Sequence, residues 1–353
     1  LAPTTTPNAR EVQPMTSVPH RSADASAGPA DGPADGTAPP RVLFLGGLGR
    51  SGTTLVERLL GELPGAMALG EVVHLWERGV HAGERCGCGV AFGECPVWRR
   101  VGEAAFGGWD AVDLDRFADL HAAVDRTRHI PMLSRGRLPA DRAPLVAEYV
   151  DHYLRLYRAV AAEAGATVLI DSSKQASLAF CLRWAARAGH LDLRVLHVVR
   201  DSRGVAYSWT REVRRPEADA GGDEYMTRWT PPRTAVHWNA ENGAYQLLAR
   251  RDVRVKRMRY EDFVADPRAR LREIARFAGL PADDEALAFV GDCRAELTAN
   301  HTASGNPMRF RTGRIDVRSD DRWRTALPAA DQRRVTAMTL PLLRHYSYLG
   351  GDA

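Results

Sequence analysis

Residues 41–60, RVLFLGGLGRSGTTLVERLL, decide the fold of this chain. The apolar run 41–46 has the composition of a buried strand and ends in glycines, and residues 54–60 carry apolar side chains at helical spacing. The stretch therefore predicts a strand, a glycine-rich loop and a helix in direct succession. A strand and a helix joined in this way form the first half of a βαβ unit, which builds a parallel sheet.

The glycine loop has the spacing of an anion-binding loop. Four residues separate Gly47 from Gly52, as in nucleotide P-loops, where main-chain N–H groups and a helix N-terminus receive a phosphate. A loop that serves ATP or GTP has a lysine directly after the second glycine, but here that residue is Thr53. Arg50 instead places a cation inside the loop, where it suits negative charge that grows on a leaving oxygen. A nucleotide kinase is thus disfavoured and is kept only as an alternative.

Strand-like and helix-like segments alternate through the rest of the chain. Their connections are short enough for βαβ units. We therefore expect an α/β fold of the P-loop type, with three αβα layers and a central, mostly parallel sheet. The predicted helices are 144–165, 175–188, 202–213, one that contains Trp238 and Leu247, 267–278 and 328–346, and the predicted strands are 167–170, 194–199 and 253–258.

Composition separates a tail from one large domain. Residues 1–39 have too little apolar surface to order themselves, so we predict a disordered tail and one domain over 40–350.

No stretch approaches the roughly 18 apolar residues that cross a bilayer, and no apolar signal core follows basic residues near residue 1, so we expect the cytoplasm. The net charge of +4 and the dispersed arginines favour a small polyanionic ligand over nucleic acid.

A second anion site is predicted at the end of the strand 194–199. Arg200 follows that strand directly, at the sheet edge where ligands gather in open α/β proteins. Ser208 lies two helical turns further on, and a guanidinium with a hydroxyl suits a terminal phosphate. A capping or salt-bridging arginine is the alternative for Arg200 alone.

Both segments resemble motifs of the sulfotransferases that use 3′-phosphoadenosine 5′-phosphosulfate (PAPS), including the tyrosylprotein and carbohydrate types. In that family a Lys or Arg followed by Ser-Gly-Thr-Thr opens the first helix, and residues 50–54 match without a gap. The resemblance covers about residues 41–325 and implies PAPS as sulfuryl donor, a hydroxyl or amine acceptor and no required metal. It implies 5′-phosphosulfate contacts by Gly49, Arg50, Ser51, Gly52, Thr53 and Thr54, and 3′-phosphate contacts by Arg200 and Ser208.

Two later segments extend this resemblance. Residues 304–311 contain Gly and Pro, which favour a loop, and resemble the loop that closes over the 3′-phosphate. The resemblance assigns this contact to Arg309, with Arg311 and Arg314 as alternatives. Tyr260 matches a position that is often close to the nucleotide, although a tyrosine packed at a strand end is an equal interpretation.

The reaction also needs a base and a charge that stabilises the transferred group. Glu71 follows the break at residues 64–65, and its position resembles that of the catalytic Glu of tyrosylprotein and some bacterial sulfotransferases, with His74 as the competing base. Lys174, one of two lysines in the chain, follows the strand 167–170 and resembles the lysine that contacts the sulfuryl group. Asp171 and Ser173 bind acceptor or cap the following helix.

Three of the five cysteines are close together in the sequence. Cys86, Cys88 and Cys95 either hold a metal with a fourth ligand such as His81 or close a tight loop. Around them, residues 75–143 with Trp76, Trp98 and Trp109, and residues 214–232, either line an acceptor pocket, form a lid or are structural.

The acceptor is open at this stage. A small molecule, carbohydrate, lipid or peptide all fit the sequence, and so does any oligomeric state. A non-catalytic nucleotide-binding protein is the third functional class, but it has no need for both Glu71 and Lys174.

Overall fold

The predicted strand at residues 41–46 is the middle strand of a five-stranded sheet. In the computed structural model, which describes residues 38–215 and 225–349, this strand is β1 (Arg41–Gly46). All paired strands of the sheet are parallel, in the order β2-β3-β1-β4-β5. The other strands are β2 (Ala66–Gly70), β3 (Val168–Lys174), β4 (Asp192–Val199) and β5 (Arg254–Arg259).

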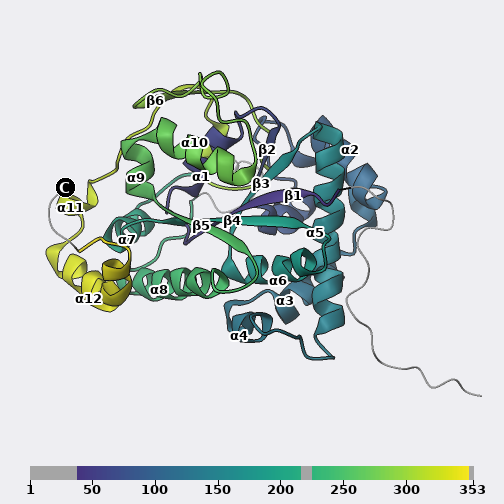
Figure 1. Cartoon of the computed structure of the whole chain (residues 1–353), viewed down its shortest axis with the longest axis horizontal. Coiled ribbons are helices and arrows are strands. Elements are labelled where there is room, and N and C mark those ends of the chain that lie inside the picture. Colours follow the sequence, from purple (N-terminus) through teal and green to yellow (C-terminus); the bar gives the residue numbers. More distant parts are fainter. Residues whose placement is uncertain (1–37, 216–224, 350–353) are drawn as a thin grey trace, which may run out of the picture. The chain divides into compact units, whose positions relative to one another are not determined.

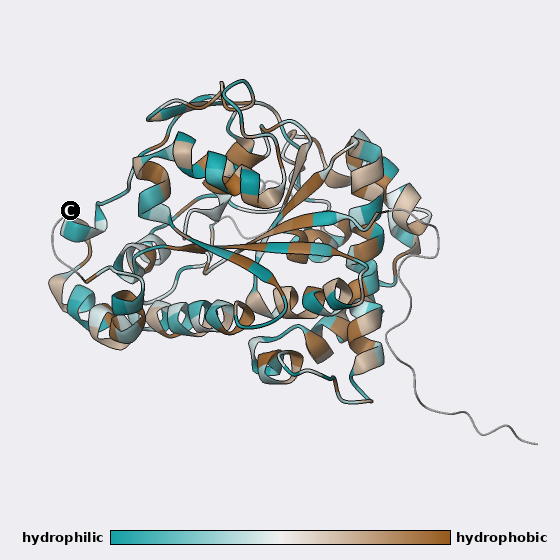
Figure 2. Ribbon diagram, in the orientation of Figure 1, coloured by the Kyte–Doolittle hydropathy of each residue, from teal (hydrophilic) through white to brown (hydrophobic). Residues whose placement is uncertain are grey.

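Alternation along β1 divides the core into two apolar layers. Val42 and Phe44 are fully buried on one face of the sheet, and Leu43 and Leu45 are fully buried on the other. Figure 1 shows helices on both faces, and Figure 2 shows the apolar residues of the central strands between them. The Leu43 face is covered by α1 (Thr53–Leu60), α9 (Tyr260–Ala265) and α10 (Pro267–Ala278), and the Val42 face by α5 (Ala143–Ala164), α6 (Ala176–Arg187) and α8 (Pro231–Leu248). The predicted three-layer αβα fold is therefore confirmed.

The helix boundaries follow local sequence signals. In α10 the carboxylate of Asp266 accepts a hydrogen bond from the N–H of Ala269, and Pro267 occupies the first turn. The helix ends at Gly279, whose φ of 83° suits a residue without a side chain. Where such signals are present, the predicted and observed helices agree within two residues, as for 144–165 and 267–278.

A long, mainly helical insertion lies between β2 and β3. Trp76 and Trp98 are buried in it, and Trp109 packs edge-on against Trp76. These aromatic side chains therefore belong to the core. Their packing favours a structural role for the three tryptophans over a role in an acceptor pocket or a lid. The insertion contains η1 (Val72–His74), η2 (Leu75–His81), η3 (Phe92–Glu94), α2 (Pro96–Phe106), η4 (Trp109–Ala111), α3 (Leu114–Val124), η5 (Thr127–His129) and α4 (Ile130–Leu133).

The C-terminal part adds a hairpin-like strand pair and three helices. β6 (Arg294–Leu297) and β7 (Gly313–Asp316) pair antiparallel, with η7 (Pro307–Phe310) in the segment between them. α7 (Ser202–Thr210), α11 (Trp323–Ala326) and α12 (Ala329–His345) lie together beside α8 (Figure 1). The prediction of a helix over 202–213 was too long, because the backbone is extended from Arg211.

Two predictions fall wholly or partly outside the described residues. The proposed tail, residues 1–39, lies there except for its last two residues, and the segment 214–232 lies partly there. The described residues belong to one compact unit, while the domain limits at 40 and 350 stay predictions. Among the described residues, none of the helices combines the length and apolarity of a membrane span.

Candidate functional site

Three cations meet at the carboxyl edge of the sheet. Arg50 follows β1, Lys174 ends β3 and Arg200 follows β4, and these strands are neighbours. Arg50 and Lys174 have φ angles of 76° and 68°, in the left-handed region that residues with a side chain rarely adopt. Strained backbone of this kind persists where surrounding structure enforces it, often at functional sites.

The glycine loop wraps closely around its neighbours. Gly52 has a φ of 90° at the start of α1, and a Cβ atom there would lie 2.2 Å from the Tyr260 ring. A Cβ on Gly46 would likewise lie 2.2 Å from the Tyr245 ring. No side chain caps α1, so the N–H groups of Thr53 and Thr54, in its first turn, have no intrahelical acceptor. The loop thus offers free donors and the positive end of a helix.

Glu71 and Lys174 form an ion pair at the centre of this edge. Nζ of Lys174 lies 2.5 Å from Oε1 of Glu71, and Nε2 of His74 lies 3.8 Å from Oε2. Burial opposes ionisation of Glu71 more than any single neighbour favours it, but the charge and hydrogen bond of Lys174, together with His74 and Arg78, hold the pKa of Glu71 below its ordinary value. Burial lowers the pKa of His74 to about 4, so its imidazole is neutral at pH 7. The two sequence-predicted base candidates thus lie together, one ionised and one neutral.

A buried network positions the segment that carries Glu71. The Ser173 hydroxyl accepts a hydrogen bond from the N–H of Val73 and donates one to Asp171, which also accepts from the Tyr157 hydroxyl at 2.6 Å. Asp171 is fully buried, and burial raises its pKa to about 6. Asp171 and Ser173 therefore support the backbone. Neither side chain caps α6, whose N-cap is Gln175, so the capping alternative was wrong, and acceptor binding stays a prediction.

A second buried acid lies beside this pair, and the sequence analysis missed it. Glu57 on α1 accepts hydrogen bonds from the N–H of Gly70 and the hydroxyl of Ser172, both at 2.6 Å. Burial raises the pKa of Glu57 to about 7. Its position on a regular helix turn gave no signal, because a glutamate at helical spacing is ordinarily solvated.

Arg50 is a half-buried cation with hydrogen-bonding capacity to spare. Its Nη2 atom is buried and makes no hydrogen bond within residues 38–215 and 225–349. The guanidinium lies 5.5 Å from the ring of Trp209, and burial lowers its pKa, partly compensated by Glu71. A buried donor without an acceptor costs about 1–3 kcal/mol, so an anion at this position would relieve that cost.

Arg200 faces the other end of the glycine loop. Its guanidinium donates to the carbonyl oxygen of Arg50 at 3.1 Å and to that of Asp320 at 3.2 Å, and it lies 4.8 Å from the Tyr260 ring. The structure thus brings Arg200, Tyr260 and the loop together. Ser208 lies on α7, half-buried, and its hydroxyl has no hydrogen-bond partner in the part of the chain described here.

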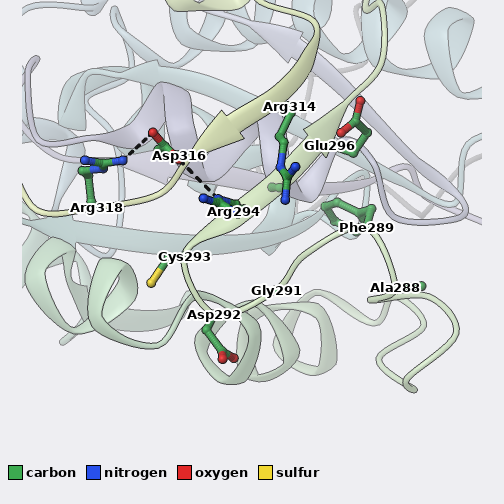
Figure 3. Close-up of a pocket in the computed structure, with 11 residues that line it drawn as sticks. Ala288, Phe289, Gly291, Asp292, Cys293, Arg294, Glu296, Arg314, Asp316 and Arg318 are labelled. Carbon is green, nitrogen blue, oxygen red and sulfur yellow. Dashed lines mark hydrogen bonds and ion pairs between the residues drawn. The ribbon is translucent and has the colours of Figure 1, made fainter.

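The structure places the three late arginines elsewhere. Arg309 is 1% exposed and donates to the carbonyl oxygens of Thr302 and Arg85. Arg311 is exposed, and Arg314 lines a separate pocket of about 780 Å³ beside β6 and β7 (Figure 3). The late residue that does contact Arg200 is Asp320, through its carbonyl oxygen. No local sequence signal indicated this contact.

The separate pocket holds none of the other predicted site residues. Two of its arginines are compensated, because Asp316 pairs with Arg318 at 2.5 Å and with Arg294 at 3.7 Å (Figure 3). Its lining comes from residues 288–296 and 314–318, which include none of the loop residues 47–54 and none of Glu71, Lys174 and Arg200. Its geometry therefore adds nothing to the candidate site.

Two stacked tryptophans border the glycine loop and were also missed. The indole N–H of Trp209 donates to the carbonyl oxygen of Gly49 at 2.9 Å, and its ring stacks on Trp229 with centroids 3.8 Å apart. These residues form an apolar wall beside Arg50. Their spacing of 20 residues carried no sequence signal, because the two rings come together only through folding.

The cysteine cluster gathers around a histidine other than the expected one. Cys86, Cys88, Cys95 and His301 have ligand atoms within 4.8 Å of one another. His81 is exposed and is not part of this group, so the choice of His81 as an example of a fourth ligand was wrong.

The arrangement defines an α/β protein of P-loop-like αβα fold, with cations at the ends of three parallel strands. The model of the Sulfotransferase family matches residues 40–284, more than half of the chain, and the chain belongs to this family.

Relatives and solved structures are similar over different lengths. Carbohydrate sulfotransferase 3 of Homo sapiens is 28% identical over 175 residues, and that of Tetronarce californica is 27% identical over 179 residues. The aligned segments cover 46% and 45% of this chain but only 35% and 36% of those relatives. The sulfotransferase domain of the Synechococcus PCC 7002 olefin synthase superposes with a TM-score of 0.48 at 23% identity, covering 87% of this chain and 96% of that one. Sulfotransferase STF1 of Mycobacterium tuberculosis H37Rv superposes with a TM-score of 0.37 at 18% sequence identity. That superposition covers 71% of this chain and 70% of STF1.

Proposed function

We propose that the chain transfers a sulfuryl group from PAPS to a hydroxyl of an acceptor. The observation that carries this proposal is the convergence of Arg50, Lys174 and Arg200 around the glycine loop, with Glu71 among them. Membership of the sulfotransferase family supports the reaction class. The absence of a lysine at position 53 weighs against phosphoryl transfer from ATP.

In the proposed complex the loop binds the 5′-phosphosulfate. The N–H groups of Thr53 and Thr54, at the N-terminus of α1, receive the phosphate together with the loop residues Gly49 to Gly52, and Ser51, Thr53 and Thr54 add hydroxyls beside it. Arg50 stabilises the charge that grows on the bridging oxygen as its bond to sulfur breaks. The unsatisfied Nη2 of Arg50 supports this role, because an anion would supply the acceptor that it lacks.

Glu71 and Lys174 are proposed to act on opposite sides of the transferred group. Lys174 exchanges its contact with Glu71 for an oxygen of the sulfuryl group. Glu71, released from that pair, takes the proton of the acceptor hydroxyl while the new oxygen–sulfur bond forms and the bond to the phosphate oxygen breaks. His74 remains the alternative base, since its neutral imidazole lies 3.8 Å from Glu71.

The 3′-phosphate is proposed to bind between Arg200 and Ser208. Arg200 uses only main-chain acceptors at present, and the Ser208 hydroxyl has no partner in the described part of the chain, so both have capacity for a ligand. The packing of Tyr260 against Arg200 and the loop supports a position close to the nucleotide. The contact by Arg309 stays a sequence-based prediction.

For the acceptor we propose a carbohydrate-type hydroxyl. The partial similarity to carbohydrate sulfotransferase 3 supports this choice. A panel that contains sugars, phenols, a tyrosine peptide and lipids, incubated with sulfur-labelled PAPS, tests it. Label transfer to a sugar supports the proposal, and transfer confined to another class contradicts it.

The donor site is tested by calorimetric titration with 3′-phosphoadenosine 5′-phosphate. Binding of this nucleotide, loss of binding in Arg200→Ala, and no comparable binding of ATP are expected. Arg254→Ala is the matched control, because Arg254 is on the adjacent strand but at its amino end, paired with Asp192 at 2.6 Å. Equal or tighter binding of ATP would show a kinase-like loop and overturn the proposal.

A further inference from the structure

Three cysteines and one histidine converge outside the sheet edge. Sγ of Cys86 and Sγ of Cys95 lie 3.7 Å and 3.3 Å from Nδ1 of His301, and Sγ of Cys88 lies 3.9 Å from Sγ of Cys95. Three thiols and one imidazole are one of the common ligand sets of structural zinc sites.

The separations fit a tetrahedral ion. With Zn–S bonds of about 2.3 Å and Zn–N bonds of about 2.0–2.1 Å, tetrahedral ligands lie about 3.8 Å apart for two sulfurs and about 3.6 Å apart for sulfur and nitrogen. All ligand atoms here lie within 4.8 Å of one another. A disulfide would use only two of the three thiols and would need its sulfurs at about 2.05 Å.

The backbone around the cysteines is shaped for a tight loop. Arg85 and Ala91 form an antiparallel bridge, and between them the N–H of Gly89 donates to the carbonyl oxygen of Cys86 at 2.8 Å. Gly89 has a φ of 95°, which favours glycine at this turn. Cys95 follows η3 and precedes Pro96 at the start of α2, so Cys86 and Cys88 share one turn and Cys95 is held by a second local structure.

His301 is fixed against this loop from several sides. The N–H of Gly87 donates to the carbonyl oxygen of Thr302 at 2.9 Å, and the indole N–H of Trp98 donates to that of His301 at 2.8 Å. A Cβ atom on Gly87 would lie 2.2 Å from Oδ1 of Asn300, so the close approach requires glycine. Arg309 spans the junction through the carbonyl oxygens of Arg85 and Thr302.

We propose that Cys86, Cys88, Cys95 and His301 bind one structural zinc ion. Cys86 and Cys95 are fully buried and Cys88 and His301 are half-buried, so the site is closed to substrate. Four protein ligands fill a tetrahedral site and leave no position for a reacting water. Each thiol that binds the ion releases its proton to solvent.

The ion would join two segments that lie far apart in the sequence. His301 is 206 residues after Cys95, and beyond it Ala303 donates through its N–H to the carbonyl oxygen of Leu69 at 2.8 Å. The carbonyl oxygen of Ser304 then accepts from the N–H of Glu71 at 3.0 Å. The zinc ion therefore anchors the segment that packs against the end of β2, independently of what the sheet edge binds.

The test is zinc content of the full chain, expressed with zinc and purified without chelator, measured by inductively coupled plasma mass spectrometry. One zinc ion per chain is expected, with X-ray absorption showing three sulfur ligands and one nitrogen ligand. A chain that holds no zinc, that holds iron instead, or whose intact mass shows the loss of two hydrogens in a disulfide would overturn the proposal.

Matched variants separate the ligands from the other cysteines and histidines. Cys95→Ser and His301→Ala are expected to lower zinc content at least tenfold, whereas Cys293→Ser, Cys181→Ser and His81→Asn are expected to keep it. His301→Cys is expected to retain zinc with four sulfur ligands. This variant shows whether zinc is lost from His301→Ala because a ligand is missing or because the protein misfolds. Retention of zinc in a folded His301→Ala protein would contradict the assignment.

Discussion

The two halves of the carboxyl edge of the sheet treat charge differently. Beside β2 and β3, the cation Lys174 is paired with the carboxylate of Glu71 at 2.5 Å. Beside β4, the guanidinium of Arg200 donates hydrogen bonds to the carbonyl oxygens of Arg50 and Asp320, and it makes no ion pair within residues 38–215 and 225–349. A charge pair can exchange partners and move a proton, whereas a guanidinium held by carbonyl oxygens keeps a fixed position and its full charge. The first half is thus suited to chemistry and the second to holding an anion.

The largest expected effect follows from the chemical half. Glu71→Gln is expected to lower kcat by about 10²- to 10⁴-fold, the usual contribution of a general base. The affinity for 3′-phosphoadenosine 5′-phosphate should stay within about twofold, because the nucleotide phosphates bind to other residues. Steady-state kinetics with the acceptor found in the panel, together with calorimetry, measure both. His74→Asn is the control; a larger fall in kcat for this variant would move the base to His74.

The next effect concerns the anion-holding half. Arg200→Ala is expected to weaken binding of 3′-phosphoadenosine 5′-phosphate by about 10- to 150-fold, because hydrogen bonds to a charged group contribute about 1.5–3 kcal/mol. Binding of adenosine 5′-phosphate, which lacks the 3′-phosphate, should change little. Competition titrations with the two nucleotides compare them. If both nucleotides lost affinity equally, the two halves would not be separate phosphate sites.

A smaller effect is expected from the support beneath the chemical half. Tyr157→Phe removes the hydrogen bond to the buried Asp171 and should lower the free energy of unfolding by about 1–3 kcal/mol. Urea denaturation followed by circular dichroism measures this change. Tyr346→Phe is the comparison variant, since the hydroxyl of that equally buried tyrosine meets the neutral amide of Gln246 and the carbonyl oxygen of Asn242 instead of a carboxylate. An unchanged stability of Tyr157→Phe would show that Asp171 does not depend on this hydroxyl.

The smallest effect is a change in pH dependence. The folded-state pKa of Glu57 is about 7, above its ordinary value of 4.5, so between these pH values the folded chain binds more protons than the unfolded chain. Stability due to Glu57 is therefore greatest at low pH and falls as pH rises toward 7. Glu57→Gln should flatten this fall when denaturation is measured from pH 5 to 8. A slope equal to that of the parent chain would contradict the raised pKa.

The sequence was sufficient for the elements whose signals are local. Helices such as 267–278 have a cap, a first-turn proline and a terminal glycine within the same short stretch. The short strand 66–70 was missed because its residues, Ala, Met, Ala, Leu and Gly, have no β-branched side chain. The strand pair β6 and β7 was missed because 15 residues separate the two short strands, so no hairpin turn signal joins them.

The candidate site divides in the same way. Arg50, Lys174, Arg200 and Glu71 each follow a strand or the first helix, so one sequence suffices to place them near the sheet edge. Asp320, Glu57 and His301 reach their partners only through packing. His301 in particular approaches cysteines more than 200 residues earlier in the chain, a distance at which no spacing rule applies.

The distance between Cys95 and His301 sets an order of events during synthesis. At about 5–20 residues per second, the 206 residues between them take about 10–40 s to be translated. For most of that interval the three thiols are outside the ribosome, while the proposed fourth zinc ligand, His301, has not yet emerged. On the zinc proposal, the thiols are open to oxidation during this interval, and zinc shortage would extend it beyond the release of the chain.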